Sequence, residues 1–182
     1  MQRKQFLATT LAAIPVLGFS KTIFTGENPK KTFTVKAGKG RFNESFLFKG
    51  KNPNDIKISK KDTNNQLAVF EYIGYEKIGP ALHIHLKQDE IFYVSEGEYR
   101  FVAGDETQIL TAGDTIFLPR NVPHTWIQLS DKGKLIYFVQ PAGKMEEFFR
   151  TMNNLTHPPT TAEINKIHAD CDLKVVGPPL SL

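Results

Sequence analysis

"HIHLKQDEIFYVSEGE", residues 83–98, is the stretch that decides how this chain folds and what it binds. Side chains of an extended strand alternate between two faces, so His83 and His85 point to the same side if "LHIHL" is a strand. The next four residues, "LKQD", are typical of a turn that brings the chain back as "EIFYV". Glu90 can then face the two histidines from a neighbouring strand. Two imidazoles and a carboxylate on adjacent strands can share a metal ion.

The segments on either side of this stretch indicate further strands. They are rich in β-branched and aromatic residues and are separated by turns that contain Gly, Asp or Pro. The chain also has fourteen phenylalanines, which suits a core built from many short strands. This pattern predicts an all-β fold, an antiparallel barrel or sandwich. The expected strands lie within residues 67–76, 81–86, 90–104, 107–119 and 124–141.

Helical patterns are confined to the C-terminal part. "GKMEEFFRTM", residues 143–152, has apolar side chains at helical spacing and predicts a short helix that packs on the barrel. Thr160 and Glu163 fit a capping box that opens a second helix. The tail, residues 173–182, is too rich in proline to continue that helix.

The N-terminus has the features of a targeting segment. Residues 1–20 begin with Arg3 and Lys4 and continue through fourteen uncharged, mostly apolar positions from Phe6 to Phe19. This pattern resembles a secretory signal peptide, and "RKQFL" resembles a twin-arginine export motif with Lys4 in place of the second arginine. We therefore expect export to the periplasm or medium; an ordinary N-terminal helix on a cytoplasmic protein is the alternative. The apolar run is shorter than the roughly 20 residues that a spanning helix needs, so no stable membrane insertion is expected.

With 182 residues the chain suits one folded domain. We expect a signal peptide (1–20), N-terminal strands and loops of the barrel (21–66), the barrel core (67–142) and a C-terminal helical extension (143–182). A single cysteine, Cys171, excludes an intramolecular disulfide and is expected to be an inert thiol.

The formal charge of +4 does not indicate a nucleic-acid partner. Between Lys30 and Lys61 there are ten Lys or Arg residues and only two acidic ones, but the basic residues are scattered among Gly, Asn and Pro. No arginine cluster, aromatic stacking pattern or helix-turn-helix accompanies them. They are typical of solvated loops and edge strands, where lysines discourage aggregation.

A second motif completes the candidate metal site. "GDTIFLPRNVPHTWIQ", residues 113–128, supplies His124, so that the full ligand set is His83, His85, Glu90 and His124. Any one strand histidine is more often a packed or hydrogen-bonded residue than a ligand. Together, however, three imidazoles and a carboxylate inside a barrel without a cation would be buried polar groups that lack partners, each at a cost of about 1–3 kcal/mol. The set of four therefore favours a bound metal ion. His157 and His168 lie in the C-terminal part and are expected to be solvated.

The spacing of these residues resembles the cupin family. Residues 83–97 resemble the first cupin motif, in which HxH is followed by four residues, Glu, six residues and Gly. The second motif is matched by Gly113, Pro119 and His124. Asn121 replaces a usual glycine and can adopt a left-handed backbone, and Gln128 replaces a usual asparagine. The resemblance implies a double-stranded β-helix, or jelly-roll barrel, with one divalent metal ion per chain. A homodimer is one assembly that the resemblance suggests.

Within the cupins, the chain looks most similar to small single-domain proteins related to quercetin dioxygenases. "DEIFYVSEGEYRF", "AGDTIFLPRNVPHTW", "PAGKMEEFF" and the terminal "VVGPPL" carry this resemblance. It implies a metal-dependent dioxygenase that acts on a small hydroxylated aromatic or enol substrate, with Glu90 as ligand and base. The ligand set admits Fe, Mn, Ni, Cu or Zn. A non-redox isomerase or lyase and a non-catalytic protein that binds a small ligand are the alternatives.

Strand alternation also predicts an apolar substrate pocket beside the metal. Each of its aromatic residues could equally belong to an ordinary packed core. The predicted pocket residues are Phe92, Tyr99, Phe101, Phe117, Trp126 and Gln128.

Overall fold

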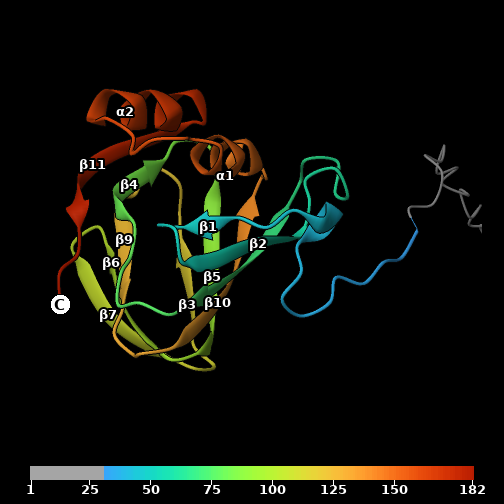
Figure 1. The fold of residues 1–182 in the computed structure, drawn as a ribbon. Helices are drawn as coiled ribbons and strands as arrows, with labels where there is room; N and C mark the ends of the chain where they lie inside the picture. The colour runs from blue at the N-terminus through green and yellow to red at the C-terminus, as the bar shows by residue number, and fades with distance from the viewer. Residues whose placement is uncertain (1–30) are drawn as a thin grey trace, which may run out of the picture. The chain divides into compact units, whose positions relative to one another are not determined.

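The computed structural model describes residues 31–182, and within it Thr32–Leu182 form one compact unit. Two antiparallel sheets face each other across an apolar core, as Figure 1 shows. The six-stranded sheet has the order β1-β2-β3-β10-β5-β8 and the five-stranded sheet the order β11-β4-β9-β6-β7. The first sheet contains β1 (Leu47–Phe48), β2 (Asn52–Ile58), β3 (Ala68–Gly74), β5 (Asp89–Glu96), β8 (Thr115–Leu118) and β10 (Gly133–Gln140). The second contains β4 (Ala81–His85), β6 (Glu98–Ala103), β7 (Glu106–Thr111), β9 (His124–Gln128) and β11 (Leu173–Pro179).

This arrangement confirms the predicted all-β jelly-roll barrel. The alternation of side chains in β5 is the clearest example, since Glu90, Phe92 and Val94 are buried while Tyr93 is exposed. The turns also follow the sequence. Gly97 joins β5 to β6 with a φ of 88°, and a Cβ there would lie 2.4 Å from the hydroxyl of Ser130.

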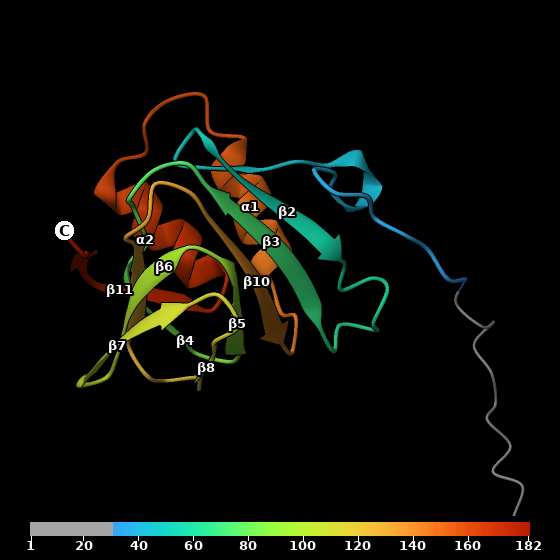
Figure 2. The same ribbon diagram turned by 90° about the horizontal axis from the view of Figure 1, so that it is seen from below.

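The two predicted helices are present at one end of the barrel, where Figure 2 shows them behind the space between the sheets. Helix α1 (Met145–Asn153) buries Met145 and packs Phe149 edge-to-face against Phe70 of β3, with ring centroids 5.3 Å apart. Helix α2 (Thr161–Asp170) begins with the predicted capping box, in which the Thr160 hydroxyl accepts from the Glu163 N–H and the Glu163 carboxylate accepts from Thr160. A short 3-10 helix, η1 (Arg41–Asn43), precedes β1.

The C-terminal segment is not purely helical. Residues 173–179 form β11, which pairs with β4 at the edge of the five-stranded sheet. Pro178 and Pro179 are compatible with this position because proline, which has no N–H to donate, is tolerated on edge strands.

Two predictions lie beyond what the structure tests. The expected signal peptide, residues 1–20, falls outside the described residues, and export stays a prediction. Within residues 31–182, neither helix has the length and apolar character required to cross a membrane.

Candidate metal centre

Three strands bring the four predicted ligands together at one end of the barrel. His85 is the last residue of β4, Glu90 the second of β5 and His124 the first of β9. His83 is paired directly opposite His124 across β4 and β9, and Glu90 reaches the histidines from the facing sheet. One potential ligand atom from each of the four residues lies within 4.8 Å of the others. The spacing read from the sequence therefore corresponds to a cluster in space.

Backbone carbonyls orient two of the three imidazoles. The Nδ1–H of His83 donates to the carbonyl of Ala81 at 2.8 Å, and that of His124 donates to the carbonyl of Val122 at 3.0 Å. This tautomer, assigned from the hydrogen-bonding partners, leaves each Nε2 as a lone-pair donor toward the cluster. The same arrangement orients metal-ligating histidines in general.

The atoms at the centre of the cluster are all acceptors. The Nε2 atoms of His124 and His85 lie 3.2 Å and 3.6 Å from Oε2 of Glu90. In the neutral tautomer assigned above, the proton of His124 is on Nδ1, so its Nε2 and the Glu90 carboxylate present lone pairs to each other. Lone pairs that converge at these distances need a cation between them, so the residues fit a metal ion.

His85 supplies a second indication that a ligand belongs here. Its ring is 1% exposed, and neither of its nitrogens has a hydrogen-bond partner. A buried polar group without a partner is uncommon and costly. A metal ion bound at Nε2 would satisfy the nitrogen that faces Glu90.

The protonation states also suit a divalent cation. Burial, with smaller contributions from His124 and His85, lowers the pKa of His83 to about 3, and burial likewise lowers the pKa of His85. Burial opposes ionisation of Glu90, but His85 and His124 favour it, and on balance its pKa falls to about 2. At neutral pH His83 and His85 are therefore neutral imidazoles and Glu90 is a carboxylate, and each of these forms can bind a divalent cation.

The predicted pocket residues divide into three groups. Phe92 and Trp126 are buried, and each lies two residues from a candidate ligand on the same strand. Phe101 of β6 is also buried; it pairs with Trp126, and its ring centroid lies 5.4 Å from that of Phe92. Tyr99 and Gln128 are buried too, but they pair with each other farther along β6 and β9. Gln128 is four residues from His124, roughly 13 Å at about 3.3 Å per residue.

Gln128 and Tyr99 therefore have structural roles. The Gln128 amide accepts from the Tyr99 hydroxyl at 3.3 Å and donates to the carbonyls of Gly74 at 3.3 Å and Ser130 at 2.9 Å. These bonds tie the end of β9 to β3 and to the following loop.

The prediction for Phe117 is wrong. Its side chain is 58% exposed, on the outer face of β8. Phe117 pairs with Ile91 of β5, whereas Leu118 pairs with the inward-facing Glu90. Strand alternation therefore directs Leu118 into the barrel and Phe117 out of it.

The sequence reasoning missed Tyr137 of β10. Tyr137 is 5% exposed and stacks on Phe92 with centroids 5.0 Å apart. Burial and the nearby Glu90 carboxylate raise its pKa, and its hydroxyl donates to Asn54 at 2.8 Å. Alternation within "KLIYFVQ" could have found it, because Leu135, Tyr137 and Val139 share one face.

The remaining histidines stand apart from the cluster. His157 is exposed, as expected. His168 is half-buried rather than solvated, because its Nδ1 bonds to the carbonyl of Ile164 at 2.7 Å and its ring packs on Phe148. Cys171 is buried, and burial raises the pKa of its thiol, consistent with an inert residue.

Comparisons with known proteins agree with this architecture. Residues 71–140, which include all four candidate ligands, match the family Cupin_2, described as "Cupin domain". Quercetin 2,3-dioxygenase of Bacillus subtilis is 23% identical over 149 residues, which cover 79% of this chain and 43% of that protein. Quercetin 2,3-dioxygenase of Aspergillus japonicus is 34% identical over 86 residues, which cover 44% of this chain and 25% of that protein. The chain thus spans less than half the length of these curated relatives.

A solved structure shows the same fold. An RmlC-like cupin from Shewanella frigidimarina superposes with a TM-score of 0.53 at 20% identity, over 64% of this chain and 96% of that one. The family match, the paired sheets and the two motifs together show that this chain contains a cupin domain, which includes residues 71–140.

Proposed function

We propose that this protein is a metal-dependent dioxygenase that acts on a small hydroxylated aromatic or enol substrate. The observation that carries the proposal is the converging set of three imidazoles and one carboxylate, all from buried or half-buried residues. A divalent ion held by these residues supplies a positive centre that orients the substrate and dioxygen and stabilises developing negative charge.

Glu90 is suited to accept a proton. Its carboxylate is ionised at neutral pH, 4% exposed, and held by β5 between His85 and His124. With a pKa of about 2 Glu90 is a weak base on its own, but a divalent ion held by these residues would lower the pKa of a substrate hydroxyl beside it, so that the proton could pass to this oxygen. The resulting enolate or phenolate is electron-rich and more readily oxidised.

The rest of the centre would control access and water. His83 is the least buried ligand, so its side of the cluster offers the approach to the site. On the inner side, the aromatic layer of Phe92, Phe101 and Trp126 keeps bulk water away from the ligands. An apolar wall of this kind suits an aromatic substrate.

The relatives support the proposal as an analogy. The two curated proteins that this chain partly matches are both quercetin 2,3-dioxygenases. Because cupins share a fold across different functions, the likeness supports a reaction class to test rather than a specific substrate.

The test begins with elemental analysis of the purified protein by inductively coupled plasma mass spectrometry. Protein loaded with its redox-active metal is then assayed with flavonoid and phenolic substrates on an oxygen electrode. Loss of a general base typically costs about 10²–10⁴ in rate, so we expect a drop of that size for Glu90→Gln. Glu98→Gln, an exposed acid at the start of β6, is the matched control and should keep full activity.

Three outcomes would contradict the proposal. Full turnover by a metal-loaded Glu90→Gln protein would rule out Glu90 as the base. Stoichiometric zinc with oxygen-independent turnover would indicate a non-redox isomerase or lyase. Saturable binding of a small molecule without any product would indicate a non-catalytic binding protein.

A further inference from the structure

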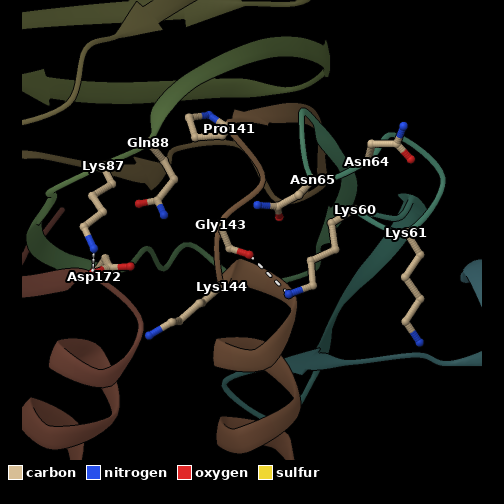
Figure 3. Close-up of a pocket in the computed structure, with 10 residues that line it drawn as sticks. All are labelled: Lys60, Lys61, Asn64, Asn65, Lys87, Gln88, Pro141, Gly143, Lys144 and Asp172. Carbon is tan, nitrogen blue, oxygen red and sulfur yellow. Dashed lines mark hydrogen bonds and ion pairs between the residues drawn. The ribbon is translucent and has the colours of Figure 1, made fainter.

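A pocket of about 660 Å³ lies beside the metal centre, in the loops at the end of the barrel. Its walls come from the segment before β3, the turn after β4, the connection from β10 to α1, and Asp172 ahead of β11. Figure 3 shows Lys87, Gln88 and Asp172 on one side of Gly143 and Lys60 reaching toward it from the other, with Lys61 pointing away from the rest. The lining includes Lys60, Lys87, Gln88, Gly143, Lys144 and Asp172.

The lining is positively charged. It carries four lysines and one aspartate. Lys60 pairs with Glu147, and Lys87 pairs with Asp172 at 2.8 Å. Lys144 instead donates to the backbone carbonyl of Asp170 at 2.8 Å, and within residues 31–182 it forms no ion pair with a carboxylate. Its charge is therefore available to an anion.

The first turn of α1 adds to this polarity. Lys144 is the N-cap residue of α1, and no side chain caps that end of the helix. Free N–H groups and the positive end of the helix dipole favour negative charge. Glu147 offsets part of this field but is already engaged by Lys60.

Gln88 supplies an independent indication of a ligand. The residue is 1% exposed, yet neither atom of its amide has a hydrogen-bond partner. It packs so closely on Gly143 that a Cβ there would lie 2.0 Å from its Nε2. In Figure 3 its amide lies between Lys87 and Gly143 and faces the pocket. A ligand oxygen would satisfy the NH₂ group.

Gln88 also connects the pocket to the metal centre. It lies in the turn between β4 and β5, three residues after His85 and two residues before Glu90, and both its side chain and that of His85 are buried. His85 is the one ligand histidine whose Nδ1 has no carbonyl acceptor. With its NH₂ group turned to a ligand, the Gln88 Oε1 can accept from Nδ1–H of His85 and leave Nε2 for the metal.

We propose that this pocket binds a small organic acid, whose carboxylate accepts hydrogen bonds from the Gln88 NH₂ group and the Lys144 ammonium, and that Gln88 couples this binding to the metal centre. The volume admits a metabolite-sized molecule rather than a single inorganic ion. The proposal that the pocket binds an acid depends only on the residues that line the pocket. The coupling rests on the metal centre proposed above.

The pocket is tested with metal-free protein by isothermal titration calorimetry. Benzoate is the probe, and benzamide is its uncharged counterpart. We expect benzoate to bind and benzamide not to bind. Lys144→Gln and Gln88→Met should each weaken benzoate binding about 10-fold or more, the size expected for a charge-assisted hydrogen bond. Lys132→Gln, an exposed loop lysine elsewhere, is the control and should bind within about twofold of wild type.

A second probe, methylphosphonate, distinguishes a site for carboxylates from a site for phosphonates. Methylphosphonate binding more tightly than benzoate would overturn the assignment to a carboxylic acid. Equal affinities in wild type, Lys144→Gln and Gln88→Met would overturn the site.

The coupling has its own readout, metal affinity measured by titration with and without benzoate. Saturating benzoate should tighten metal binding in wild type and have no effect in Gln88→Met, because coupled ligands strengthen each other reciprocally. Benzoate binding with no effect on metal affinity in wild type would overturn the coupling. Absence of metal binding at any benzoate concentration would instead refute the metal centre, and the metal-free titration would still decide the pocket.

Discussion

Metal binding should raise the unfolding temperature of the wild-type protein but not that of a His85→Gln variant. A ligand that binds only the folded state stabilises it by about 2.7 kcal/mol when its free concentration is 100 times its Kd. The unfolding entropy of about 150 residues, at roughly 2.1 cal/mol/K for each residue, is about 0.3 kcal/mol/K. The expected rise is therefore about 9 °C.

His85 is the sharpest position for this test because its ring nitrogens have no hydrogen bonds to lose. The metal-free variant should accordingly fold, with most of the wild-type stability. The measurement is calorimetry of metal-free protein titrated with Mn²⁺, Fe²⁺, Ni²⁺, Cu²⁺ or Zn²⁺. His157→Gln, which removes an exposed histidine, is the control and should respond like wild type. An equal metal-dependent rise in His85→Gln would refute the proposed ligand set.

Three further predictions concern the fold. Phe92→Ala should lower the free energy of unfolding by about 3–5 kcal/mol, whereas Phe117→Ser should change it by less than about 0.5 kcal/mol, as measured by urea denaturation; equal losses would contradict the inward and outward assignments. Gln128→Leu should cost about 1–3 kcal/mol in the same assay, because its buried hydrogen-bond partners stay unpaired; a neutral effect would refute its structural role. Hydrogen bonds from Arg120 lower the pKa of Asp89 to about 2, so the stability that this pair adds is present above pH 4 and is lost as the pH falls toward 2. In an NMR titration, Arg120→Gln should return the pKa of Asp89 toward 3.8. An unchanged pKa would contradict this cause.

Much of the barrel and the candidate centre could be predicted because both depend on local rules. Period-two alternation places Glu90 and Phe92 on one face of β5 whatever the neighbouring strands do. Backbone stereochemistry explains Asn121, which adopts a φ of 66° where glycine is usual. The capping box at Thr160 is likewise contained within four consecutive residues. Such features need no knowledge of the tertiary fold.

The errors and omissions depend on which strands pair. The outward direction of Phe117 follows from its register with β5, since the run "TIFL" offers apolar side chains to both faces. β11 is a strand because the edge of β4 is available to it, which the prolines in its sequence do not reveal. Gln88 gains its importance from contact with Gly143, 55 positions away. Contacts between distant segments cannot be read from one sequence without a fold.

The pairing of β11 with β4 has a consequence for biosynthesis. Each residue of β4, which carries His83 and His85, has a partner in β11, with two register shifts beyond Val175, whereas β4 pairs with β9 only at His83. During translation, His83 and His85 therefore lack their partners in β11, Val175 and Leu173, until residue 175 has emerged from the ribosome. The centre can take its final geometry, and so acquire a metal ion, only as a late step in maturation.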